Sequence, residues 1–405
     1  MRRWRLFLVV GLLVCGVGAA WWWHAINYCE LPQPTISTLI AHTSQPIQAQ
    51  SVAQLAEIAA IEGTARSRAA FSPNDHWLVS IGIASSVWGN SHLSADSPHC
   101  SVTWIVDVSG NAPQPQVVVN NSGIVPHWLW LVPDLSFNHD GSLVALNNLQ
   151  KQIISVPSGQ ELARLEWSED PFFTGTVLFS PDDKRLFAAV DSQILVWDAT
   201  TFAFGEALAG HTDHVGALGF GDNLISASSD GMLRSWNLET GEGTIIYQTH
   251  AENLINMDVG LKGKIAVSYL NHAVILDEAT GAEYMDLMPG TVQFSVDERS
   301  VMSYSYKDLW VWDVQNQRLL TRIQVGADVQ LRTATFDPTG ELIGAGFSDG
   351  TLNVYSVTGE RLLSEQVVEA AEITDVAFNH MGTLLAVSWR SDNRWRGGVQ
   401  LWGVE

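Results

Sequence analysis

Two histidines are the residues of this sequence whose spacing first suggests metal chemistry. His211 and His214 stand three residues apart. Two imidazoles at that separation can hold one metal ion when both lie on the same face of a helix. Here they flank a turn between strands, so we expect no metal site.

Acidic residues recur in turns and could suggest a set of calcium ligands. Calcium needs several oxygen ligands at about 2.3–2.6 Å, and the spacing of a calcium-binding helix–loop–helix is absent. Aspartate is also common in turns because its carboxylate accepts hydrogen bonds from its own backbone, and this is the role that we predict. The carboxylates concerned are Asp182, Asp183, Asp297, Glu298 and Asp337.

The usual enzyme motifs are missing. The sequence contains no G-x-S-x-G, H-E-x-x-H, P-loop or C-x-x-C motif. The stretch Asp277-Glu278-Ala279-Thr280-Gly281 resembles quinoprotein repeats faintly, but the tryptophan expected after such a motif is absent. We therefore predict a protein that is not an enzyme, without catalytic residues, metal or cofactor. A quinoprotein-type or hydrolase-type enzyme is the alternative.

Two segments combine residue types that are enriched at protein-binding surfaces. Arg394, Trp395 and Arg396 form a basic and aromatic cluster in an acidic protein, and Trp88 lies in the long segment 84–100. Tryptophan and arginine are frequent at binding hot spots. We predict that these four residues contact a partner, although each segment could equally be a solvated loop.

A repeat must position these residues. Eight copies of a short apolar strand pair end in large apolar residues at positions 106, 154, 197, 236, 276, 312, 355 and 402, which are 36 to 48 residues apart. Most copies contain a turn such as Phe179-Ser180-Pro181-Asp182 or Phe336-Asp337-Pro338-Thr339. A four-stranded blade of a β-propeller needs about 40–45 residues, so the spacing predicts an all-β propeller. Eight blades is our count, and seven is the alternative if one degenerate copy is an insertion.

The fourth copy resembles the WD40 repeat. Gly210-His211, Ser228, Asp230-Gly231 and Trp236-Asn237 follow that repeat's signature, and Trp197-Asp198 and Trp312-Asp313 carry its name-giving pair. The resemblance covers residues 50–405 and implies a WD40-type β-propeller, of the bacterial and membrane-anchored or exported kind.

The resemblance also implies a buried hydrogen-bonded chain in the fourth copy. Carried over residue by residue, His211 accepts from Ser228 or donates to Asp230, and Trp236 donates its indole N–H to Ser228. Such a chain stabilises a sheet core only when every member is satisfied. We predict a structural tetrad with no catalytic role.

The last copy ends at Glu405 without a fourth strand. We expect the segment 51–63 to supply it, with Ile58–Glu62 pairing against Val399–Trp402, because a closed ring removes an exposed sheet edge. The propeller domain is then 51–405, and the polar segment 24–50 is a spacer.

The N-terminus suggests a membrane segment. Arg2, Arg3 and Arg5 precede an uncharged run from Leu6 to Trp23, which is long enough to nearly span a bilayer as a helix. Residues 1–23 are therefore predicted to be either a hydrophobic signal anchor or a cleaved signal peptide. Both interpretations place the propeller outside the cytoplasm, membrane-anchored in the first and secreted or periplasmic in the second.

Cysteine content and charge narrow the function classes. Cys29 and Cys100 could form a disulfide in an oxidising compartment, or stay as two free thiols. The net charge of −22 disfavours nucleic-acid binding. We predict a non-catalytic extracytoplasmic scaffold that binds a protein partner of unknown identity through its propeller loops. A structural accessory of an envelope complex is a further alternative.

Overall fold

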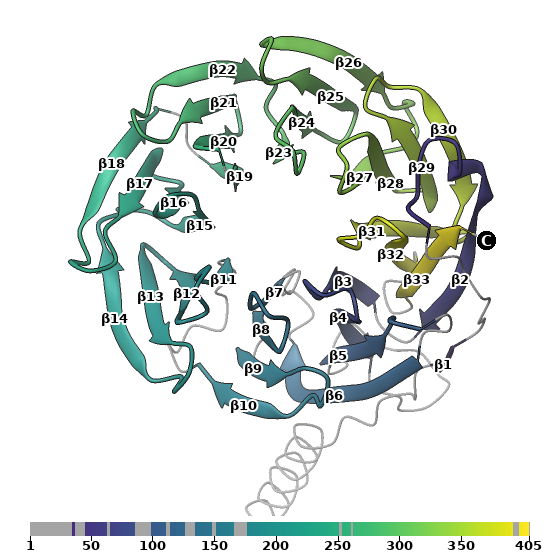
Figure 1. Ribbon diagram of the computed structural model, residues 1–405, viewed down its shortest axis with the longest axis horizontal. Coiled ribbons are helices and arrows are strands. Elements are labelled where there is room, and N and C mark those ends of the chain that lie inside the picture. The colour runs from purple at the N-terminus through teal and green to yellow at the C-terminus, as the bar shows by residue number, and fades with distance from the viewer. Residues whose placement is uncertain are drawn as a thin grey trace, which may run out of the picture.

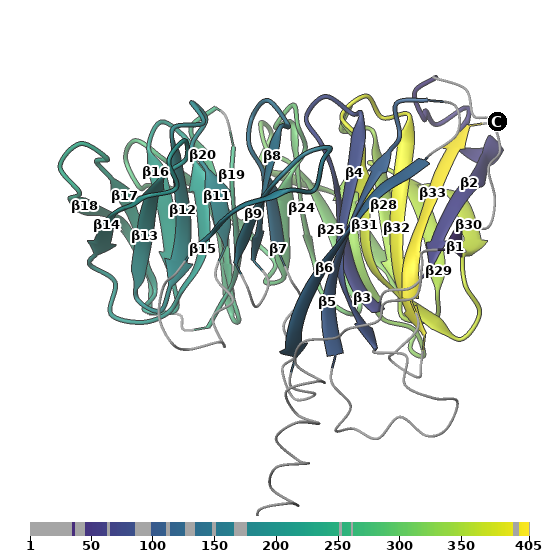
Figure 2. The same ribbon diagram turned by 90° about the horizontal axis from the view of Figure 1, so that it is seen from below.

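The structure is a computed structural model, and it describes most of the repeat region. The described residues are 35–36, 45–62, 65–85, 99–110, 114–125, 134–147, 151–165, 176–250, 253–260, 262–391 and 397–404. Within them, the strands form eight antiparallel sheets arranged around a central axis (Figure 1). Seen from the side, the sheets stand next to one another as a disc (Figure 2). The all-β propeller with eight blades is confirmed.

Each blade is a meander whose first strand lies nearest the axis (Figure 1). The first four blades are β3 (Ala65–Phe71), β4 (Trp77–Ser85), β5 (His99–Asp107) and β6 (Gln114–Val125); β7 (Asp134–Phe137), β8 (Leu143–Asn147), β9 (Gln152–Ser155) and β10 (Glu161–Arg164); β11 (Val177–Phe179), β12 (Arg185–Val190), β13 (Gln193–Asp198) and β14 (Phe204–Ala209); and β15 (Val215–Phe220), β16 (Leu224–Ser228), β17 (Met232–Trp236) and β18 (Gly243–Gln248).

The remaining blades continue the same order. They are β19 (Leu254–Val259), β20 (Lys264–Tyr269), β21 (His272–Asp277) and β22 (Glu283–Leu287); β23 (Thr291–Phe294), β24 (Ser300–Tyr304), β25 (Asp308–Asp313) and β26 (Arg318–Gln324); β27 (Leu331–Phe336), β28 (Leu342–Phe347), β29 (Thr351–Ser356) and β30 (Arg361–Gln366); and β31 (Ala371–Phe378), β32 (Leu384–Ser391) and β33 (Gly397–Val404) with β2 (Leu55–Glu62).

The hydrophobic core is divided among the contacts between blades. Each of the eight core clusters of described residues combines side chains from two neighbouring blades. The second strand of a blade is therefore covered on both faces, and every residue of β28 is buried, whereas the outermost strand β14 is mostly exposed. This explains why the second strands read as continuous apolar runs and do not alternate.

The ring is closed by the predicted strand. β2 pairs with β33 in antiparallel register, with Ala59 opposite Leu401 and Ile61 opposite Val399, so the predicted pairing is confirmed. A short 3-10 helix, η1 (Val52–Gln54), leads into β2. Ile58 is fully buried between this sheet and blade 1, which covers the edge that an open propeller would expose.

Part of the segment 24–50, expected to be a spacer, packs against the propeller. β1 (Thr35–Ile36) pairs with β2, and Ile47 is buried in the cluster between blades 7 and 8. The main-chain N–H of Ile47 donates to the carbonyl of Gly382 at 2.7 Å. These residues belong with the propeller and not with a spacer.

Turn carboxylates link neighbouring blades on one face of the disc. Three residues in the turns between first and second strands have positive φ and reach back to the preceding blade: Asp75, Asp183 and Glu298. An Asp183 oxygen accepts from the N–H of His139 at 2.7 Å, and a Glu298 oxygen accepts from the N–H of Lys262 at 3.0 Å. Capping of their own turns, which we expected for both residues, is therefore wrong. Asp182, in contrast, bonds Ser180 and Lys184 of its own turn.

The same kind of link crosses the seam of the ring. Asp75 of blade 1 accepts hydrogen bonds from the main chain of His380 at 2.8 Å and of Met381 at 2.7 Å, both in blade 8. The His380 ring Nδ1 also lies 3.0 Å from an Asp75 oxygen. Residues about 305 positions apart are thus joined by side chain as well as by strand pairing.

The expected membrane anchoring has to be corrected. Among the residues that the structure describes, no helix is long and apolar enough to cross a bilayer, and the hydrophobic segment 6–23 lies outside those residues. The predicted location, membrane-anchored or exported with the propeller outside the cytoplasm, is therefore given up. The choice between signal anchor and signal peptide for residues 1–23 also falls outside the described part of the chain.

Candidate functional site

The fourth blade contains a continuous buried chain of polar side chains. The Trp236 indole N–H donates to Ser226 Oγ at 2.8 Å, and Ser226 Oγ lies 2.7 Å from His211 Nε2. His211 Nδ1 lies 3.0 Å from Asp230 Oδ2. Asp230 also accepts from the main chain of Met232 at 2.9 Å. Every donor and acceptor along the chain has a partner.

The hydroxyl in this chain belongs to Ser226, so the predicted assignment to Ser228 was wrong. β16 pairs with β17 so that Leu224 lies opposite Trp236. Ser226 is two residues from that pair on the same face, whereas Ser228 is four residues away, about 13 Å at 3.3 Å per residue. Ser228 instead donates to the carbonyl of Asp213 at 2.9 Å and accepts from the N–H of Asp230 at 3.1 Å.

This hydrogen-bonded chain has a structural role, and its histidine is uncharged. Burial lowers the pKa of His211, and the hydrogen bond to Asp230 only partly opposes this shift, so the imidazole is neutral near pH 7. A neutral His211 donates from Nδ1 to the carboxylate and accepts at Nε2 from Ser226. Blades 6 and 8 do not repeat the arrangement, because the buried indole nitrogens of Trp312 and Trp402 have no hydrogen-bond partner within the described residues.

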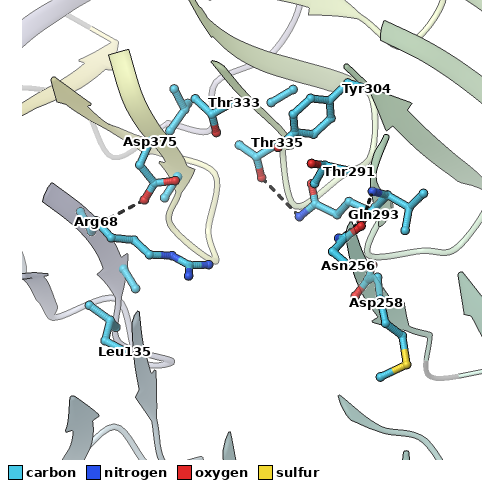
Figure 3. A pocket seen from close by; sticks show the side chains of 17 residues that line it. Arg68, Leu135, Asn256, Asp258, Thr291, Gln293, Tyr304, Thr333, Thr335 and Asp375 are labelled. Atoms are coloured by element: carbon cyan, nitrogen blue, oxygen red, sulfur yellow. Dashed lines mark hydrogen bonds between the residues drawn. The ribbon is translucent and has the colours of Figure 1, made fainter. Parts of the chain in front are cut away.

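A cavity of about 400 Å³ lies on the propeller axis. Its walls come from the innermost strands of blades 1, 2, 5, 6, 7 and 8, together with β24. In Figure 3, Arg68 and Asp375 face Gln293 and Asn256 across the open centre. The polar lining residues are Arg68, Asn256, Asp258, Thr291, Gln293, Tyr304, Thr333, Thr335 and Asp375.

One wall of the cavity is charged. Arg68 Nη1 donates to Asp134 Oδ1, and about half of the Arg68 side chain is exposed. Asp375 accepts from the N–H of Ala69 at 3.2 Å, which links blade 8 to blade 1. Burial raises the pKa of Asp375, and the neighbouring Arg68 guanidinium opposes that shift. An arginine paired with one carboxylate and close to a second leaves this wall with excess negative charge when both carboxylates are ionised.

The opposite wall offers further acceptors. Asp258 Oδ2 accepts from the N–H of Phe294 at 2.7 Å, and burial raises the pKa of Asp258. Asn256 bonds both the N–H and the carbonyl of Val292 at 2.8 Å, so its amide joins blades 5 and 6. Gln293 Oε1, in contrast, is buried without a hydrogen-bond partner among the described residues.

A second feature lies on the surface built by the second-to-third strand turns and the connections between blades, which we call the connection face. Blades 5 and 6 expose large apolar side chains there, with 67% of Leu270, 43% of Met288 and 63% of Tyr306 exposed. On the opposite face, Val296 and Met381 are exposed to a similar extent, but their turns belong to blades 6 and 8. The apolar residues of the connection face occupy adjacent blades, so they can act on one partner.

Charged side chains continue this feature into blades 7 and 8. The Arg332 guanidinium lies 5.8 Å from the centre of the Tyr306 ring, within the range of cation–π attraction. Arg332 and Arg390 both bond Glu372, the former at 2.9 Å. Tyr306, Arg332, Glu372 and Arg390 thus form a row of linked side chains beside the apolar residues, in which Glu372 neutralises part of the arginine charge.

The predicted partner-binding residues lie outside the described part of the chain. Trp88 falls between β4 and β5, and Arg394, Trp395 and Arg396 fall between β32 and β33, directly after the strand that carries Arg390. Their contacts therefore stay predictions. The same holds for the Cys29–Cys100 disulfide, because Cys29 is not among the described residues. In the described ranges, no group of three or more metal-ligating side chains comes together.

Comparison with known proteins finds a similarity to WD-repeat proteins over part of the chain. The family model described as "WD domain, G-beta repeat" matches residues 204–237, which are the last strand of blade 3 and the first three strands of blade 4. Actin-interacting protein 1 of Caenorhabditis elegans is 23% identical over 45% of this chain and 31% of its own length. The Periodic tryptophan protein 2 homolog of Dictyostelium discoideum is 20% identical over 61% of this chain and 28% of its length.

These findings and the eight-bladed ring support a WD40 β-propeller. The matched regions cover less than a third of either relative. Both relatives are eukaryotic, so the predicted bacterial type is not supported. WD40 propellers commonly bind protein partners, which suggests a protein-interaction scaffold.

Proposed function

We propose that this protein is a non-catalytic scaffold that binds a protein partner across the connection face of blades 5 to 8. The observation that carries the proposal is the exposure of Leu270, Met288 and Tyr306 on adjacent blades of one face. In an acidic protein with a net charge of −22, large apolar side chains gathered on adjacent blades of one face suit a surface that a partner covers.

The composition of this surface fits a protein partner. Apolar and aromatic side chains at the centre with arginines at the edge are the usual make-up of a protein-binding hot spot. Arg332 packs beside the Tyr306 ring, so the aromatic ring is held in place before the partner arrives, which reduces the entropy lost on binding. Loops on a rigid disc are also the common binding elements of repeat proteins.

Site-specific photo-crosslinking in cells tests the proposal. A photoreactive phenylalanine analogue replaces Tyr306 or Leu270 in separate variants and Val296 in a control variant, because Val296 is as exposed as these two but lies on the opposite face. We expect one discrete crosslinked protein from the first two positions and none from the control. Equal crosslinking at Val296, or no crosslink at Tyr306 and Leu270, would refute the proposed surface.

A further inference from the structure

The fourth strand of blade 1 has an outer edge that can accept another strand. β6 lies at the rim of the ring (Figure 1). It is 12 residues long, whereas the fourth strands of the other blades have four to eight residues. Within the described part of the chain, β6 pairs with β5 alone, so the main-chain N–H and C=O groups of its outer edge have no strand partner there.

The sequence of β6 also lacks the charges that usually protect such an edge. No Asp, Glu, Lys or Arg occurs from Gln114 to Val125, and Val117, Val118 and Val119 have high β-propensity. The fourth strands of blades 2, 3, 5, 6, 7 and 8 each contain at least one charged residue. Charged side chains on an edge strand oppose pairing with another chain, so β6 is less protected than these six strands.

The fourth strand of blade 4, β18, is uncharged as well, but blade 5 covers part of it. The Tyr247 hydroxyl lies 2.9 Å from His272 Nε2 and donates to Glu283 at 2.9 Å. A turn of blade 5 lies so close that a Cβ on Gly281 would be 1.8 Å from the main-chain oxygen of Ile246. β18 is also half as long as β6, so it offers much less main chain to a further strand.

Strand addition at the rim already occurs once in this chain. β1 pairs antiparallel with β2, with Thr35 opposite Glu62 and Ile36 opposite Ile61, so the outer edge of blade 8 carries a fifth strand. Blade 8 is the neighbour of blade 1 in the ring (Figure 1). The rim therefore has room for a strand beyond the fourth.

We propose that β6 pairs with β6 of a second copy of this chain and forms a symmetric dimer. The register of β6 against β5 is regular from Val117 to Asn121 and shifts on both sides of this stretch. A two-fold axis at Val119 places Val119 opposite itself and Val117 opposite Asn121, in antiparallel register.

Charge favours a second copy as the occupant of this edge. Two copies with a net charge of −22 each repel one another, and this repulsion is smallest where an uncharged strand faces itself. Self-pairing of β22, which carries two acidic residues, or of β26, which carries two arginines, would bring like charges together. The surface of blade 1 is separate from the connection face of blades 5 to 8, so the dimer does not depend on the proposed function.

Sedimentation velocity of the full chain between about 1 and 100 µM tests the dimer. Because small interfaces are weak, we expect a reversible dimer with a dissociation constant in the micromolar range. Val119→Lys places two ammonium groups opposite each other at the two-fold axis and should weaken the dimer about tenfold or more. Ile245→Lys makes a similar change at an exposed residue of β18 and should leave the dimer unchanged. A wild-type chain that is monomeric at about 100 µM, or a dimer that is equally stable in Val119→Lys, overturns the proposal.

Mixing two variants tests the position of the two-fold axis. Val119→Glu should be monomeric by itself for the same reason as Val119→Lys. An equimolar mixture of the two should dimerise again, because opposite charges then face each other across the axis. A folding defect cannot produce this recovery. A mixture that stays monomeric, while both variants keep the circular dichroism spectrum of the wild type, refutes the proposed pairing.

One further variant keeps the test decisive if the Val119 variants fail to fold. Asn120→Lys changes a residue that is already polar, so blade 1 should keep its fold, as circular dichroism will show. The proposed register places Asn120 opposite Val118 of the second copy, and the added charge should weaken the dimer about threefold or more. An unchanged dimer in this variant would contradict the register and overturn the proposal.

Discussion

Replacing Ser226 by alanine should destabilise the propeller more than the same change at Ser228. The Ser226 hydroxyl is fully buried and bonds both His211 Nε2 and the Trp236 indole N–H. Removing it leaves two buried polar atoms without a partner, at about 1–3 kcal/mol each. We expect a loss of about 2–6 kcal/mol in the free energy of unfolding. Ser228 is equally buried. Its hydroxyl donates to the carbonyl of Asp213, an exposed residue that water can hydrate, so the loss of Ser228 should cost less, about 1 kcal/mol.

Urea unfolding followed by circular dichroism measures both losses, and a double-mutant cycle assigns them. In a Trp236→Phe background, the indole donor is already gone, so Ser226→Ala leaves only His211 Nε2 without its hydrogen-bond partner. Its cost should then fall by about 1 kcal/mol or more, since the two residues are directly bonded. Equal losses for Ser226→Ala and Ser228→Ala, or no coupling between Ser226 and Trp236, would refute the hydrogen-bond chain as we describe it.

Three further predictions concern the seam and the turns. The hydrogen bond to Asp75 raises the pKa of His380, and the hydrogen bonds that Asp75 accepts lower the pKa of Asp75 although burial opposes this. The pair is therefore charged between about pH 4 and 6.5, where His380→Ala should lower the melting temperature most, with a cost of about 0.5 kcal/mol. The effect should be smaller at pH 8, and an equal effect at every pH would contradict this prediction. Gly281→Ala places Cβ 1.8 Å from a main-chain oxygen of blade 4, whereas Gly263→Ala meets nothing within 4 Å, so thermal melts should show a larger loss for the former by about 2 kcal/mol or more, and equal melts would argue against this packing. Ile58→Asp should destabilise by about 3 kcal/mol or more because it buries an unpaired charge at the seam, and a small loss by urea titration would mean that the strand does not close the ring.

The architecture could be predicted because it depends on patterns that repeat. The spacing of large apolar residues such as Trp197, Trp236 and Trp312 follows the length of a four-stranded blade. The last copy lacks a fourth strand, so a strand from the N-terminal part of the chain has to complete that blade. The tetrad was only partly predictable. Ser226 and Ser228 point to the same face of β16, and only the register of Leu224 against Trp236 decides between them.

The candidate sites could not be predicted from the sequence. Leu270 and Met288 look like ordinary strand-end residues, because exposure depends on how neighbouring blades cover each turn. Arg68 and Asp375 are far apart in the chain and come together only when the ring closes. No local motif marks such a pair. The hydrophobic segment 6–23, in contrast, clearly indicated a membrane segment. The membrane-anchored or exported location predicted from it had to be corrected.

Closure by β2 makes the ring depend on the end of synthesis. Leu55 pairs with Val404, so the first propeller strand to leave the ribosome has to wait for the last. At about 5–20 residues per second, roughly 350 residues take about 20–70 seconds. During that time the apolar edge around Ile58 has no native neighbour, and another nascent chain on the same messenger could pair with it. A helper protein that shields residues 55–62 until translation ends would therefore raise the yield of monomeric rings.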